Sequence, residues 1–312
     1  MPTDSPSYDL VISGGRVIDP ANAIDARLDV AVKDGSIAAV QAGIDTSNTT
    51  RVIDATGFTV TPGLIDLHTH VAAGIRKPAG EDLMVSPDVA GVISGVTTVL
   101  DAGSTGALNI GGLVNAVAPQ AITRVLALIS VGSMGVANIP EVRTAEDINP
   151  AAAVEAIQSS PDIIKGVKVR MVSPGITALG IGLPRAAKAI ASEAGVPIMV
   201  HVGDIYGQDP VAAEITPELL TSVLTAGDIV THTLSGQVGA LLADGSLLPQ
   251  AQEARANGVY FDVGVGGSNF SFEAGQRVMS QSRGSPWAPI SDRNSSIARA
   301  RSSSSGKSAS SP

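Results

Sequence analysis

The chain holds four histidines in 312 residues, and each follows directly on an apolar segment. His68 and His70 form His-Thr-His after GLIDL, His201 ends PIMVH, and His232 ends DIVTH. Residues i and i+2 of a strand share a face, so His68 and His70 would point into the same space. One histidine at a strand end is more often a hydrogen-bonded structural residue. Four together predict a centre for a d-block metal ion, because imidazole nitrogen is a preferred ligand.

A fourth apolar segment, DIIKGVKVR, carries three basic residues, Lys165, Lys168 and Arg170. Desolvation and nearby metal charge favour the neutral amine of a buried lysine, which can react with carbon dioxide to form an anionic carbamate. We expect Lys168 in this role, because it lies nearer the segment's end, whereas Lys165 faces the opposite side. Arg170 shares the face of Lys168. It could bind a substrate carboxylate through two hydrogen bonds, and a structural ion pair is an equally good interpretation.

The segment LDAGSTGA contains a further carboxylate, Asp101, which could accept a hydrogen bond from a metal-bound imidazole. Gly103 and Gly106 suit a loop whose backbone approaches a substrate.

The elements that must position these residues follow a regular rhythm from residue 61 on. Short apolar segments alternate with helix-like ones, which predicts parallel βαβ units. The predicted strands are Gly63–His68, Thr97–Asp101, Arg124–Ser130, Ile163–Arg170, Pro197–Val202, Asp228–His232 and Val259–Val263, and the predicted helices include Pro184–Ala194, Thr216–Thr225 and Phe272–Gln281. Seven units with Val/Ile/Leu-rich strands favour a TIM-like (β/α)8 barrel that is incomplete. A doubly wound open sheet is the alternative, but no glycine-rich phosphate-binding motif follows the first strand.

Residues 8–60 predict a small antiparallel layer of short strands. YDLVISGGRVID alternates apolar and polar residues, with Gly14-Gly15 as a turn, and Asp34-Gly35 indicates a hairpin. We therefore expect an N-terminal β-sandwich portion over residues 1–61 and the barrel over residues 62–281.

The last 31 residues, 282–312, break this pattern: twelve are serine and five are Arg or Lys. This composition predicts a disordered tail.

Composition excludes several classes of protein. A hydrophobic content of 44% argues against general disorder, and a net charge of −9 with 3% aromatic residues argues against a nucleic-acid partner. The absence of cysteine excludes disulfides and thiolate metal sites. The sequence shows neither a basic-then-apolar leader nor an apolar segment of membrane-spanning length, so we expect a cytoplasmic protein.

Several motifs, taken together, resemble the amidohydrolase superfamily over residues 8–281. They are YDLVISGGRVID, the VIDATG turn, TPGLIDLHTH, SGVTTVLDAGSTG and IIKGVKVR. The last two resemble in particular its amidohydrolase/deacetylase metallohydrolases, which stand near the dihydroorotases and hydantoinases. The resemblance implies a metal-dependent (β/α)8 barrel with a small β-sandwich built from both chain ends.

The resemblance also implies roles for individual residues. His68 and His70 would bind the more buried of two zinc ions, His201 and His232 the second, and carboxylated Lys168 would bridge the pair. A hydroxide between the ions would attack an amide or ester carbon. An aspartate that ends the eighth strand would shuttle the proton.

The sequence departs from this family pattern where the eighth strand is due. Ile290-Ser291-Asp292 offers a candidate aspartate, Asp292, but no apolar segment precedes it. We hypothesise a frameshift or truncation near residue 282, which the other reading frames of the coding DNA would test. An open barrel without its proton shuttle predicts poor stability and little or no activity for this chain.

The leading functional interpretation is a zinc-dependent deacetylase that acts on an acylated, carboxylate-bearing small molecule. A cyclic-amide hydrolase is the close alternative. The segment VAAGIRKPAG lacks the Arg-Glu-Pro-Gly of dihydroorotases, although Arg76 is nearby. An inactive homologue that serves as a binding partner is a third interpretation, and the resemblance further suggests a homo-oligomer.

Overall fold

The computed structural model describes residues 7–74 and 84–282. The chain divides into two compact units, Met1–Leu64 and Ile65–Pro312. Apart from Ser282, the predicted tail lies outside the described residues, and so do Arg76 and Asp292.

The first unit contains one sheet, in the order β3-β2-β1-β4, with β5 also paired to β1. Its strands are β1 (Tyr8–Asp19), β2 (Ile24–Lys33), β3 (Ser36–Gln41), β4 (Thr49–Asp54) and β5 (Thr59–Val60). The expected antiparallel layer is only partly correct. β2 is antiparallel to β1 and β3, whereas β4 and β5 pair with β1 in parallel.

The two glycine signals in this unit have different outcomes. Asp34 and Gly35 join β2 to β3 with φ values of 51° and 72°, as the hairpin prediction requires. Gly14-Gly15 was predicted as a turn, and this is wrong. The pair lies within β1 at a bulge, where Gly14 has a φ of +76° and a Cβ on Gly15 would come within 2.6 Å of Val60.

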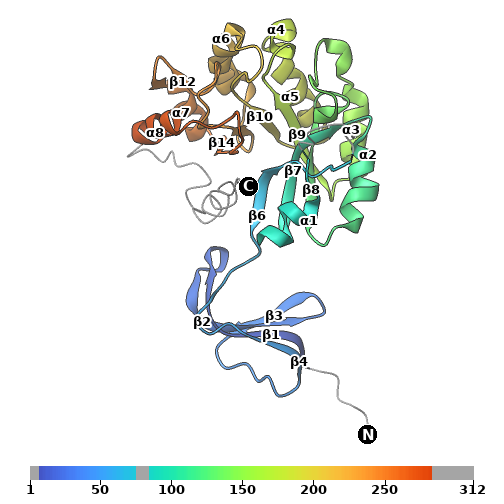
Figure 1. The fold of residues 1–312 in the computed structure, drawn as a ribbon, viewed down its shortest axis with the longest axis vertical. Coiled ribbons are helices and arrows are strands. Elements are labelled where there is room, and N and C mark those ends of the chain that lie inside the picture. Colours follow the sequence, from blue (N-terminus) through green and yellow to red (C-terminus); the bar gives the residue numbers. More distant parts are fainter. Residues whose placement is uncertain (1–6, 75–83, 283–312) are drawn as a thin grey trace, which may run out of the picture. The chain divides into compact units, whose positions relative to one another are not determined.

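The second unit is built on seven parallel strands in the order β14-β11-β10-β9-β8-β7-β6 (Figure 1). They are β6 (Ile65–Thr69), β7 (Thr98–Gly106), β8 (Arg124–Ser130), β9 (Ile164–Arg170), β10 (Ile198–His201), β11 (Ile229–Thr231) and β14 (Tyr260–Asp262). Their spatial order is their chain order, which excludes a doubly wound sheet, because that sheet reverses direction. Within the described residues β6 and β14 have one neighbour each, so the sheet is an open part of a TIM-like barrel.

Helices follow most of the strands. The α-helices are α1 (Pro87–Ala90), α2 (Ile110–Gly112), α3 (Pro150–Ser159), α4 (Gly175–Leu179), α5 (Gly182–Ala194), α6 (Pro210–Glu218), α7 (Pro249–Ala256) and α8 (Phe272–Gln281). Short 3-10 helices are η1 (Pro20–Asn22), η2 (Val92–Ser94), η4 (Ala118–Gln120), η5 (Gly135–Ala137) and η6 (Ala145–Asp147), and η3 (Leu113–Val117) and η7 (Leu219–Val223) are π-helices. A small hairpin pairs β12 (Leu242–Ala243) with β13 (Ser246–Leu247).

One predicted helix start is wrong. Helix α6 begins at Pro210 rather than at Thr216, because Asp209 caps it by accepting a hydrogen bond from the Val211 amide. Thr216 is buried inside the helix, where its hydroxyl contacts the carbonyl oxygens of Ala212 and Gly239. Residues 216–218 are favourable at a helix start, but Asp209 and Pro210 provide a stronger start signal earlier in the chain.

The core of the second unit lies between the sheet and its helices. Fully buried strand residues such as Val99, Ile129 and Val167 pack there, and α5 buries Leu183 and Ile190. This layer holds the strand ends in place, and the polar site residues stand on those ends. In the part of the chain that the structure describes, no helix combines the length and apolar character needed to cross a membrane.

Candidate metal centre

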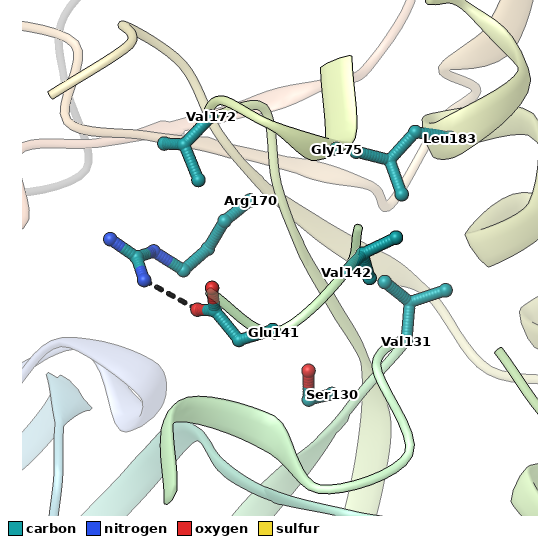
Figure 2. Close-up of a pocket in the computed structure, with 8 residues that line it drawn as sticks. All are labelled: Ser130, Val131, Glu141, Val142, Arg170, Val172, Gly175 and Leu183. Atoms are coloured by element: carbon teal, nitrogen blue, oxygen red, sulfur yellow. Dashed lines mark hydrogen bonds and ion pairs between the residues drawn. The ribbon is translucent and has the colours of Figure 1, made fainter. Parts of the chain in front are cut away.

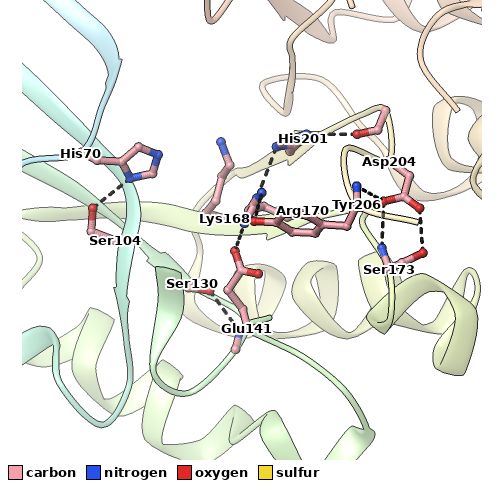
Figure 3. A network of polar contacts seen from close by, with 12 residues as sticks. His70, Ser104, Ser130, Glu141, Lys168, Arg170, Ser173, His201, Asp204 and Tyr206 are labelled. Atoms are coloured by element: carbon pink, nitrogen blue, oxygen red, sulfur yellow. Dashed lines mark hydrogen bonds and ion pairs between the residues drawn. The ribbon is translucent and has the colours of Figure 1, made fainter. Parts of the chain in front are cut away.

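The structure brings all four histidines and Lys168 together at the carboxyl ends of the parallel strands. His68 lies in β6 and His70 directly after it, while His201 ends β10 and His232 follows β11. Ring centroids are 5.9 Å apart for His68 and His70, 4.7 Å for His68 and His232, and 4.2 Å for His201 and His232. Lys168 Nζ, on β9, lies 3.4 Å from His68 Nε2. Figure 3 shows Lys168 between His70 and His201.

Lys168 is 2% exposed. Burial lowers the pKa of its amine to about 7, and Arg170 adds to this effect, while Asp262 opposes it. An uncharged amine is thus accessible near neutral pH, as carbamate formation requires. Lys165 lies on the other side of the strand, where its amine donates to the carbonyl oxygen of Pro161 at 2.7 Å.

Three of the histidine rings, those of His70, His201 and His232, are held in their neutral form. Burial lowers the pKa of His70 to about 3, with further contributions from Lys168 and Arg170. Burial and neighbouring cations also hold the pKa values of His201 and His232 well below the usual range. Neutral imidazole is the form that binds metal ions.

His68 and His232 both contact residues at or just after the end of β14. His68 Nδ1 lies 2.9 Å from Thr231 Oγ1 and 3.3 Å from Asp262 Oδ2. His232 Nδ1 donates to the carbonyl oxygen of Gly264 at 2.6 Å. These contacts orient both rings.

His70 is supported by a hydroxyl rather than by a carboxylate. Its Nδ1 lies 2.9 Å from Ser104 Oγ (Figure 3). The sequence suggested Asp101 as a direct partner of an imidazole, and this is wrong. Asp101 accepts hydrogen bonds from the amides of Val71 at 2.8 Å and Ser104 at 2.7 Å. Asp101 therefore fixes the backbone on either side of the contact between His70 and Ser104, and burial raises the pKa of Asp101.

The donor set fits a divalent transition metal ion in its chemistry. Four imidazoles, two of them buried, and a buried lysine able to lose its charge are borderline ligands of the kind that zinc prefers. Among residues 7–74 and 84–282, however, no group of three or more His, Asp or Glu side chains is arranged to hold an ion as it stands. The imidazole rings contact one another in this structure.

Arg170 lies beside this cluster in a buried ion pair with Glu141 (Figure 2). Its Nη2 donates to the Tyr206 hydroxyl at 3.2 Å, and its Nε donates to His201 Nδ1 at 3.4 Å. Burial lowers the pKa of Arg170, but Glu141 and Tyr206 outweigh it and leave that pKa above the ordinary value. The structural ion pair, one of the two interpretations of Arg170 from the sequence, is therefore present. Binding of a substrate carboxylate by Arg170 remains a prediction.

A comparison with known protein families shows which family the chain belongs to. The pattern of the Amidohydrolase family matches residues 59–259. The chain belongs to the amidohydrolase family. This agrees with the resemblance found in the sequence and with the parallel strand order.

Named relatives within the amidohydrolase family include deacetylases. One from Brucella anthropi is 32% identical over 82% of this chain, and one from Agrobacterium fabrum is 33% identical over 80%. The chain spans 61% and 59% of the lengths of these two relatives. A crystal structure of a dihydroorotase matches 88% of the chain and 70% of its own length, with a TM-score of 0.75 and 29% identity.

Sequence reasoning missed four residues of this amidohydrolase site: Ser104, Glu141, Thr231 and Asp262. Asp262 carried a usable signal, because it lies in the predicted strand Val259–Val263, and strand ends position site residues in such barrels. Thr231 directly precedes His232 and shares this signal. Glu141 lies in a loop between η5 and η6, where no periodic pattern marks it.

Proposed function

We propose that the chain is the metal-binding part of a zinc-dependent hydrolase that cleaves an amide or ester bond. The observation that carries the proposal is the gathering of four imidazoles around buried Lys168 at the carboxyl edge of the sheet. Sites of barrel enzymes lie at this edge. The amidohydrolase assignment supports the same chemistry.

His68 and His70 would hold one ion, His201 and His232 the other, and Lys168, as a carbamate, would join them. Zinc supplies a water of lowered pKa and polarises the carbonyl group to be cleaved. The chain's own contribution is to keep His70, His201 and His232 neutral and to bury Lys168, His201 and His232 at the strand ends. A proton-shuttling role for Asp292 remains a prediction from the sequence.

The substrate class that we favour is an acylated amino or hydroxy acid, which makes the activity that of a deacetylase. The deacetylase relatives align with 80% to 87% of this chain. The named dihydroorotase relatives align with 20% to 63% of it, although the dihydroorotase crystal structure matches 88%. Arg170 would meet a substrate carboxylate through N–H groups that Glu141 leaves available. A cytoplasmic location and a homo-oligomeric state belong to the same proposal.

The test is zinc-dependent hydrolysis by the purified chain of three panels: N-acetyl amino acids, acetylated hydroxy acids and hydantoins. Because the sequence predicts slow turnover, the assay uses concentrated protein and long incubation. Deacetylation that needs zinc and disappears in His201→Asn is expected. Cleavage of hydantoins alone would favour the cyclic-amide alternative. No zinc-dependent cleavage in any panel, together with no zinc bound to the purified chain, would overturn the proposal.

A further inference from the structure

The end of β14 contacts His68 through a two-step hydrogen-bond chain. The Thr231 hydroxyl donates its single hydrogen to Asp262 Oδ2 at 2.7 Å. The same hydroxyl oxygen lies 2.9 Å from His68 Nδ1, so it must accept a hydrogen from that nitrogen. His68 is therefore protonated on Nδ1. Its Nε2, which lies 3.4 Å from Lys168 Nζ, keeps the lone pair that a metal ion needs.

The same segment of chain fixes His232. A carbonyl oxygen can only accept, so the 2.6 Å contact to Gly264 requires a hydrogen on His232 Nδ1. His232 also has a φ of 68°, in the left-handed region that non-glycine residues seldom adopt. Such a backbone persists only where its surroundings determine it strongly. The contact to Gly264 is one such constraint.

Glycine at position 264 is required by the crowding at this point. A Cβ there would lie 2.5 Å from Thr231 Oγ1, 2.9 Å from His232 Nδ1 and 3.1 Å from Asp262 Oδ2. The three polar groups therefore converge on the space that a side chain would fill. Residues 262–264 thus brace two histidines that the proposed function assigns to different ions.

We propose that Asp262 and Gly264 are positioning residues that fix the Nδ1–H tautomers of His68 and His232, with Asp262 acting on His68 both directly and through Thr231. The inference rests on the proposed metal centre. A metal-binding histidine is oriented when its second nitrogen donates to a carboxylate or carbonyl group, and the loss of such a partner typically lowers metal affinity about 10- to 100-fold. The carboxylate also makes the imidazole a stronger base.

The variants that test this are Asp262→Asn, Thr231→Val and Thr231→Ser. Asp228→Asn is the matched control, because Asp228 is also buried at a strand of this sheet but pairs with Lys188 and accepts from the Ile198 amide. Zinc affinity is measured by competition with a chelator. Ring tautomers are read from nitrogen NMR of zinc-free protein labelled at its four histidines, each assigned by single His→Gln variants.

We expect Nδ1–H forms for His68 and His232 in the zinc-free wild type. Zinc affinity should fall roughly 10- to 100-fold in Asp262→Asn and Thr231→Val. It should stay at the wild-type level in Thr231→Ser and in the control Asp228→Asn. An Nε2–H form of His68, or wild-type zinc affinity in Thr231→Val, would overturn the inference. If Asp262→Asn does not fold, the two threonine variants decide the outcome.

Failure of the proposed function gives a different result. If the wild type binds no zinc, the metal centre is wrong. The tautomers of the zinc-free protein then still decide whether the end of β14 orients the two rings. If the wild type binds zinc and the threonine variants match it, the metal centre stands and the positioning role is refuted.

Discussion

Gly103 of β7 lies close to the side chain of Lys168 of β9, across the intervening strand β8. A Cβ on Gly103 would lie 2.7 Å from Lys168 Cβ and 2.8 Å from its Cγ, and Gly103 has a φ of +88°. The conformation and the close approach both require glycine. This glycine inside β7 therefore determines where the lysine stem lies.

Gly103→Ala should displace Lys168 and strain the backbone. We expect a loss of roughly 2–4 kcal/mol in the free energy of unfolding, together with reduced zinc uptake. Gly195→Ala is the control, because Gly195 also has a positive φ of 72° but nothing lies within 4 Å of its Cβ position. Denaturant unfolding and zinc titration measure the two effects. Equal zinc uptake by both variants would contradict the role of the contact.

The buried pair of Arg170 and Glu141 should be costly to break. Their side chains are 12% and 6% exposed, so Glu141→Gln leaves a guanidinium charge without its partner. We expect a loss of about 3–5 kcal/mol on denaturant unfolding. Glu218→Gln removes the exposed partner of Arg185 and should cost below about 1 kcal/mol. Similar losses for the two variants would show that Glu141 does not neutralise a buried charge.

The zinc-free protein should lose stability as the pH falls below about 6.5. The pKa of His70 is about 3 in the folded chain and ordinarily 6.5, so the unfolded chain binds the extra proton first. Between pH 6.5 and 5, His70 should account for about 1–2 kcal/mol of this loss. Unfolding measured across this window should show a smaller loss in His70→Gln. An unchanged pH slope in that variant would contradict the buried, neutral state of His70.

Much of the barrel could be predicted because its strands are short and apolar. All seven predicted segments overlap observed strands, and the polar residues at their ends converge as parallel geometry requires. Pairing direction in the first unit was harder. β4 pairs in parallel with β1 although short loops connect the strands, and local patterns carry no information about such distant partners.

Hydrogen-bond partners of the site could not be deduced in the same way. Asp101 and Asp262 both stand near strand ends, yet Asp262 contacts an imidazole directly while Asp101 binds backbone amides. Which partner each carboxylate contacts depends on the exact position and direction of its side chain, and a sequence pattern does not specify these. Glu141 lies 29 positions from Arg170, and only the folded loop brings the two together.

The central claim is that the four histidines and Lys168 bind zinc. The most direct measurement is the zinc content of the purified chain after zinc loading and desalting, beside Lys168→Met and His201→Asn. We predict about two zinc ions per wild-type chain and fewer in both variants. Zinc below stoichiometric levels in the wild type, or equal amounts in all three proteins, would contradict the claim.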